Sequence, residues 1–254
     1  MTFFQTIAVA FAMFSVVPVP QFDWNERNMR YALCAFPLVG VVCGLCWLIL
    51  AFLPLPVFLR GSLFCLAPVA VTGGIHLDGY ADTCDALASQ VDAAKKQEIL
   101  NDPHCGAFAV IRLCTWFVLY LALCVTMTPS TRAVVCATLG FVLSRALSGW
   151  SITSLPLAKN TGIAHTFATA ADRRTVCRVL TVLAAGLVIT QIVVGGVVGL
   201  AMTAAAVLAL WRYAHVAKTQ FGGISGDLAG WFLQKCELWQ LAALVLCQFL
   251  EGFL

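Results

Sequence analysis

The chain has 254 residues, of which 61% are hydrophobic and only 11% are charged, and its mean hydropathy is +0.92. Soluble domains carry about 25% charged residues because their surfaces face water. This composition therefore excludes an ordinary soluble domain and predicts an integral membrane protein in contact with the lipid bilayer. The formal net charge of +3 is too small to indicate a nucleic-acid-binding protein.

Apolar stretches follow one another from the first residues onward. A membrane span needs about 20 mostly apolar residues. The candidate stretches are 2–19, 31–53, 56–74, 107–127, 132–150, 176–195, 196–216 and 228–250. Several are short or are interrupted by Pro or Gly, so we predict an all-α polytopic fold with six to eight transmembrane helices. No internal repeat marks a second domain, and we expect one domain over residues 1–254.

Long and short connections alternate between these stretches. The long ones, 20–30, 75–106, 151–175 and 217–227, would all emerge on one side if every stretch spans. They contain eight basic residues, namely Arg27, Arg30, Lys95, Lys96, Lys159, Arg173, Arg174 and Lys218. The opposite side keeps Arg60 and Arg132. The positive-inside rule therefore predicts a multi-pass protein of the cell membrane whose long, active-site loops face the cytoplasm.

The twelve cysteines are scattered over the chain, and most lie singly within apolar stretches. In such surroundings a cysteine behaves as a small hydrophobic residue. We predict that cysteines such as Cys43 and Cys124 pack in the core and bind no metal.

An acidic segment, GGIHLDGYADTCDAL at 73–87, follows the third apolar stretch. Asp78, Asp82 and Asp85 are spaced i, i+4 and i+7, so on a helix they share one face. Like charges in this arrangement repel, and no basic residue lies between 61 and 94. Because carboxylate oxygens suit Mg²⁺, we predict that these three residues are metal ligands. The alternative is a solvated acidic helix end.

Two further polar elements lie on other connections. Asn101-Asp102-Pro103-His104 precedes the next apolar stretch and forms either an ordinary turn or part of a site. Arg145 lies near the end of an apolar segment, where an arginine either extends to the interface or faces a polar interior. The sharper interpretation is that Arg145 and Lys159 bind an anion, because cationic side chains stabilise phosphoryl charge.

The last polar element is GGISGD at 222–227. Its glycines permit close approach of the backbone to a ligand, and Asp227 follows them directly. We expect Gly222, Gly223 and Asp227 to join the site built around 73–87, because both segments follow apolar stretches that end on the same side. Glu237 is a further intramembrane acid, which pairs with Lys235 or faces the interior.

At these residues the chain resembles the cobalamin synthase family, adenosylcobinamide-GDP ribazoletransferase. The resemblance rests on GGIHLDGYADTCDAL at 73–87 and on six shorter segments spread in order over nearly the whole chain. These are VPVP at 17–20, FPLVG at 36–40, NDPHCGAF at 101–108, SRALSG at 144–149, AKNTGIAHTF at 158–167 and GGISGDLAG at 222–230. Ser15-Val16-Val17 departs from the family pattern, which often has an arginine before the proline. Cys84-Asp85-Ala86 also departs, since Ala and Gly often flank that aspartate.

The resemblance implies a Mg²⁺-dependent transfer at a pyrophosphate. Adenosylcobinamide-GDP and α-ribazole, or its 5′-phosphate, would react to give adenosylcobalamin, or its 5′-phosphate, and GMP. We assign Asp82, Asp85, His76, His104 and Arg145 to catalysis, and Asp102, Lys159, Gly222, Gly223 and Asp227 to substrate binding. The general base is Asp85, His76 or His104. A homo-oligomer is compatible with the sequence.

Two other classes of membrane protein share some of these features. A CDP-alcohol phosphotransferase also uses an Asp-rich membrane helix with Mg²⁺, but its pattern places an arginine after the alanine. Here Ala81 is followed by Asp82, and residues 86–100 lack the later acidic part of that pattern. A carboxylate-based transporter would place its acids in mid-span, often in paired repeats, whereas these acids cluster at segment ends.

Overall fold

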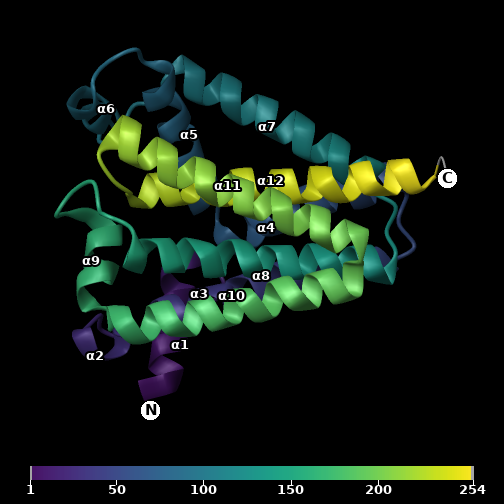
Figure 1. The fold of residues 1–254 in the computed structure, drawn as a ribbon, viewed down its shortest axis with the longest axis horizontal. Helices are drawn as coiled ribbons and strands as arrows, with labels where there is room; N and C mark the ends of the chain where they lie inside the picture. The colour runs from purple at the N-terminus through teal and green to yellow at the C-terminus, as the bar shows by residue number, and fades with distance from the viewer. Residues whose placement is uncertain (1, 253–254) are drawn as a thin grey trace.

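A computed structural model describes residues 2–252, and twelve helices account for most of this part of the chain (Figure 1). The helices are α1 (Thr2–Phe14), α2 (Glu26–Met29), α3 (Ala32–Phe52), α4 (Val57–Thr72), α5 (Ile75–Ala88), α6 (Ala93–Ile99), α7 (Ala107–Thr126), α8 (Thr131–Ser154), α9 (Gly162–Ala170), α10 (Arg173–Gly195), α11 (Val197–Phe221) and α12 (Gly226–Glu251). No named strand occurs between residues 2 and 252, so the all-α prediction is confirmed.

Five helices, α3, α7, α8, α10 and α11, are long and apolar enough to cross a membrane. The pair α4 and α5 passes the same test together, but the chain bends by 95° between them. The described part of the chain thus has five or six candidate spans, at or just below the lower end of the predicted range. The stretch 2–19 contributes only α1, whose 13 residues reach about 20 Å, less than the roughly 30 Å of a bilayer core.

Helix α12 runs through the bundle and packs against α5, α7, α8 and α11. Its 26 residues are long enough to span, but Gln234, Lys235, Glu237 and Gln240 reduce its apolar character. Most of its middle is buried by the neighbouring helices. Polar side chains in a membrane bundle are tolerated where they face other helices and not lipid. This explains why α12 is central yet less apolar than the other long helices.

The long connections meet at one end of the bundle. In Figure 1 the short helices α2, α6 and α9 lie together at the left, whereas the turn between α7 and α8 and the C-terminus lie at the right. Two glycines produce the 95° bend between α4 and α5: Gly73 and Gly74 have φ of +66° and +83°. Residues with side chains rarely adopt this left-handed conformation. The bend directs α5 across the end where the loops gather.

Candidate active site

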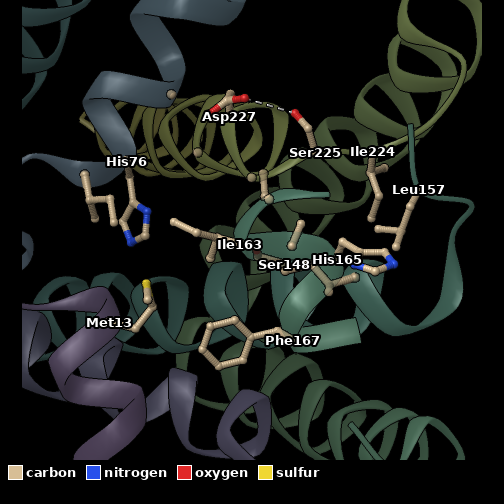
Figure 2. A pocket seen from close by; sticks show the side chains of 18 of the residues that line it. Met13, His76, Ser148, Leu157, Ile163, His165, Phe167, Ile224, Ser225 and Asp227 are labelled. Carbon is tan, nitrogen blue, oxygen red and sulfur yellow. Dashed lines mark hydrogen bonds between the residues drawn. The ribbon is translucent and has the colours of Figure 1, made fainter. Parts of the chain in front are cut away.

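A cavity of about 340 Å³ opens at the end of the bundle where the long connections meet (Figure 2). We call it the main cavity. Its polar side chains include His76, Asp78, Lys159 and Asp227, and its aromatic side chains are Phe14, Phe36, His165 and Phe167. These residues come from α1, α3, α5, α9, α12 and the connection after α8. The structure therefore brings together segments that are widely separated in sequence.

The two aspartates of the main cavity, Asp78 and Asp227, belong to helices that approach each other closely. A methyl group built at Gly79 would lie only 2.8 Å from the Cα and carbonyl oxygen of Asp227. One built at Gly230 would lie 2.9 Å from the carbonyl oxygen of His76. Small residues allow membrane helices to pack with their backbones near each other. The glycines of α5 and α12 thus place both carboxylates at one cavity.

Two loops are joined by backbone hydrogen bonds at the opposite wall. The Ile224 N–H donates to the Pro156 carbonyl at 2.9 Å, and the Ala158 N–H donates to the Ile224 carbonyl at 2.8 Å. This short bridge fixes the chain just before Lys159. The Lys159 ammonium donates to Asn101 Oδ1 at 2.7 Å, which also draws in the connection between α6 and α7. The loop 222–227 and the segment 73–87 therefore meet at the same cavity.

His76 is buried, being 5% exposed, and its ring lies 5.7 Å from that of Phe36 and 6.5 Å from that of Phe14. Its Nε2 has no hydrogen-bond partner among residues 2–252. Buried polar atoms without a partner are rare in folded proteins. Figure 2 shows the ring directed into the space bounded by Met13 and Ile163. His76 therefore has a free nitrogen available to a ligand of the main cavity.

The acidic face of α5 is divided between two environments. Asp85 does not line the main cavity. It lies beside the start of α7, where its Oδ1 accepts a hydrogen bond from the Ala109 N–H at 3.3 Å. A carboxylate is stabilised there by the helix dipole. Asp82 is half-buried and is repelled by the charges of Asp78, Asp85 and Asp227. Asp82 lines neither the main cavity nor a second cleft, described below, that contains Asp85.

Asp85 shares a separate cleft of about 330 Å³ with Asp102 and His104. Asp102 Oδ1 accepts a 2.9 Å hydrogen bond from the His104 backbone N–H and lies 2.6 Å from His104 Nδ1. These hydrogen bonds lower the pKa of the Asp102 carboxyl below its ordinary value. The two residues thus form a local turn outside the main cavity.

The arrangement of the carboxylates determines whether they can hold a magnesium ion. Among residues 2–252 no group of three or more His, Cys, Asp or Glu side chains converges on a position that would hold a metal. The described part of the chain therefore offers no closed metal cage. Mg²⁺, however, is commonly held by one or two carboxylates together with waters and substrate phosphate oxygens. Asp78 and Asp227 line the main cavity, and Asp82 lies on the same face of α5 as Asp78. One or two of these carboxylates therefore fit a Mg²⁺ ion that binds together with a phosphorylated substrate.

Arg145 lies apart from the main cavity, in the interior of the bundle. It is 1% exposed, and its Nη1 lies 2.5 Å from Glu237 Oε1 and donates to the Phe141 carbonyl at 2.9 Å. The sequence allowed Glu237 to pair with Lys235, but in the structure it pairs with Arg145. Residues two apart on a helix do not face each other, which explains why Lys235 is not the partner.

The predicted substrate-binding glycines do not line the main cavity. Gly222 ends α11 with a φ of +74°, a common glycine position at a helix C-terminus. At Gly223 a methyl group would lie 2.5 Å from the carbonyl carbon of Leu157. Both glycines therefore allow the loop bridge to form, and the residues of this loop that line the cavity are Ile224, Ser225, Gly226 and Asp227.

Several lining residues received no role from the sequence. Ser148 and His165 belong to SRALSG and AKNTGIAHTF, so their segments carried a signal that the individual residues did not. Asn101 directly precedes the predicted Asp102 and is the residue that contacts Lys159. Phe167 ends the same AKNTGIAHTF segment. Phe14 had no distinguishing signal, because an aromatic residue in an apolar segment is most often part of the core.

Comparison with known proteins gives a consistent result. The chain matches the profile of a family described as cobalamin-5-phosphate synthase over residues 6–245. It is 38% identical over 252 residues to an adenosylcobinamide-GDP ribazoletransferase of Lachnoclostridium phytofermentans, covering 98% of this chain and 96% of that protein. A protein of the same name from Geobacillus sp. is 31% identical over 236 residues, 89% of each chain. One from Clostridium perfringens is 28% identical over 239 residues, 92% of this chain and 95% of the relative. No solved structure matches. The chain belongs to the cobalamin-5-phosphate synthase family.

Proposed function

We propose that this protein is a membrane-bound adenosylcobinamide-GDP ribazoletransferase that works with Mg²⁺. A free ring hydroxyl of the ribose, present both in α-ribazole and in its 5′-phosphate, forms a bond through its oxygen to the phosphorus attached to cobinamide. The pyrophosphate bond to that phosphorus breaks, and GMP leaves. The observation that carries the proposal is the placement of Asp78, Asp227 and Lys159 around one cavity, in a chain whose relatives bear this enzyme's name.

The side chains of the main cavity suit a pyrophosphate substrate. Mg²⁺ held by Asp78 with Asp82 or Asp227 would supply charge neutralisation at the phosphate oxygens. Lys159 adds a positive charge on the opposite wall, where it binds a phosphoryl oxygen in place of its contact with Asn101. Catalysis of phosphoryl transfer depends mainly on such positioning and charge stabilisation.

His76 is the general base that fits this arrangement. Of the three candidates, it alone lines the main cavity, whereas Asp85 and His104 line the neighbouring cleft. Its unpartnered Nε2 is free to accept the proton of the attacking ribose hydroxyl. A base must reach the proton that it removes, so its location favours His76.

The two substrates differ in how they would occupy the cavity. Phe14, Phe36 and Phe167 form an aromatic wall, which suits the flat base of α-ribazole. A cavity of about 340 Å³ is near the lower limit for a drug-sized ligand. The corrinoid portion of adenosylcobinamide-GDP is larger than this, so we propose that only its pyrophosphate end enters. The positive-inside charge pattern supports entry from the cytoplasm.

Release of GMP tests the proposal directly. Purified protein in detergent would be given adenosylcobinamide-GDP and α-ribazole, and GMP would be measured against Mg²⁺ concentration. We expect turnover only with Mg²⁺ and its collapse in Asp78→Asn and Asp82→Asn. Asp92→Asn is the matched control, because Asp92 only caps α6 and asparagine is an equally good cap. An Asp82→Asn curve that overlays the wild type would remove Asp82 from the metal site. No GMP release by the wild type would refute the function.

A further inference from the structure

A second cavity, of about 350 Å³, lies between α5, α7, α11 and α12. We call it the basic cavity because three cationic side chains line it, one from each of the three longer helices: Arg112, Arg212 and Lys235. No acidic residue contributes to its lining. Such a concentration of positive charge is unusual within a membrane bundle.

The three cations have no carboxylate partner among residues 2–252. None of them takes part in an ion pair within 4.0 Å, in contrast to the Arg145–Glu237 pair. Lys235 makes a cation–π contact instead: its ammonium lies 5.9 Å from the ring centre of Tyr80. The charges of the basic cavity are therefore not neutralised by residues 2–252.

The cations lie well inside their helices. Arg112 is five residues after the start of α7, Arg212 nine residues before the end of α11, and Lys235 nine residues after the start of α12. At 1.5 Å per residue they lie roughly 8 to 14 Å from the helix ends where the long connections meet. Unpaired cations at such depths are unfavourable and usually mark a functional contact.

The basic cavity is separate from the main cavity and faces the lipid side of the bundle. Tyr80 and Cys84 line it from α5, and helical periodicity places them opposite Asp78 and Asp82. Leu119 of its lining is 50% exposed, and Trp211, beside Arg212, is 64% exposed. Arg112 and Arg212 are exposed and Lys235 is half-buried, so the basic cavity opens at an apolar, exposed surface.

We propose that the basic cavity binds the phosphate group of an anionic ligand. Two sources offer this chemistry: the headgroup of an anionic phospholipid, entering from the bilayer, and a soluble phosphate monoester. Arginine and lysine together match phosphate oxygens well, and basic pockets between membrane helices are known to receive anionic headgroups. Bound phosphate neutralises the three cations and braces the face of α5 that lies opposite the acidic residues.

Purified, lipid-depleted protein in nonionic detergent provides the test. Phosphatidylglycerol, phosphatidylcholine or glycerol 3-phosphate is added, and two quantities are measured: the melting temperature, and the rate at which a maleimide alkylates Cys84, resolved by peptide mass spectrometry. Phosphatidylglycerol should raise the melting temperature and slow alkylation of Cys84 in the wild type. Exposed Cys105, in a loop outside the cavity, should be unaffected.

Variants assign these effects to the basic cavity. Each cation near an anionic surface contributes about 1 kcal/mol, or about fivefold in affinity. The double variant Arg212→Gln, Lys235→Gln should therefore bind phosphatidylglycerol with about 25-fold lower apparent affinity. Arg178→Gln is the matched control, because Arg178 is exposed, lies five residues after the start of α10 and does not line the cavity.

Each outcome bears on the proposal. A response to phosphatidylglycerol that is lost in the double variant identifies the lipid headgroup, and an equal response to glycerol 3-phosphate identifies a soluble phosphate. Equal effects of phosphatidylglycerol and phosphatidylcholine, or unchanged affinity in the double variant, would overturn it. If the double variant does not fold, protection of Cys84 in the wild type decides alone, and its absence refutes the site.

Discussion

Replacing Arg145 tests whether its buried guanidinium acts in catalysis or in the stability of the bundle. The sequence assigns it to catalysis, whereas the structure buries it against Glu237 and away from the main cavity. We therefore predict that Arg145 acts through stability. Arg145→Met should lower both thermal stability and activity, and a second substitution, Glu237→Leu, should restore much of both.

The expected magnitude comes from the surroundings of the pair. Removing one partner of a buried ion pair costs about 3–5 kcal/mol, because the remaining charge is left uncompensated. Arg145→Met also removes the hydrogen bond to the Phe141 carbonyl, although that carbonyl keeps its place in the helix. A loss of about 4 kcal/mol corresponds to a decrease in melting temperature of roughly 10 °C for a chain of this size. Replacing both charges with apolar groups of similar volume is often neutral.

Thermal unfolding in detergent and GMP release would be measured for both single variants and the double variant. Glu237→Leu alone should also be destabilising, since it leaves the Arg145 guanidinium unpaired. Recovery of turnover in the double variant would show that the guanidinium performs no chemistry. A double variant that regains stability but not turnover would refute this reasoning and return Arg145 to the catalytic residues.

Three further predictions follow from the placement of the remaining residues. Asp227→Ala should lower turnover by about 100-fold or more. Membrane insertion should stay normal, because Ser225 still caps α12. Near-normal kinetics would show that the loop has no role in catalysis. Cysteines introduced at Asp92 and Ala170, in protein freed of its native exposed cysteines, should resist an impermeant maleimide in intact cells, and labelling of either would overturn the cytoplasmic orientation. Cys124→Ala should retain most activity because Cys124 is a buried, unpaired packing residue; loss of turnover in folded protein would contradict this.

Helical periodicity predicted the shared face of Asp78, Asp82 and Asp85, but it did not predict what each residue would meet. Asp78 and Asp85 lie about 10 Å apart along the axis of α5, so Asp78 lines the main cavity while Asp85 contacts the start of α7. Which helix lies opposite depends on the 95° bend after α4. A sequence pattern contains the period of one helix, whereas the neighbours of that helix are set by tertiary packing.

The loop at 222–227 shows a similar division. Its glycines predicted a close approach, and a close approach occurs, but the group that approaches is the backbone of Leu157. A glycine signals that space is needed and does not identify what fills it. Asp227, by contrast, was placed correctly at the same cavity as Asp78 because both segments follow apolar stretches that end on one side.

The charges inside the bundle differ in whether the chain neutralises them, and this difference separates structural from functional residues. Arg145 and Glu237 neutralise each other, so their charges require no ligand. The aspartates on one face of α5 repel one another, and the cations of the basic cavity on the opposite face have no carboxylate within reach. These two sets cannot neutralise each other, because α5 itself lies between them. We therefore expect each set to take its own counter-charge: the proposed cation with substrate phosphates on the acidic side, and the proposed anionic phosphate on the basic side.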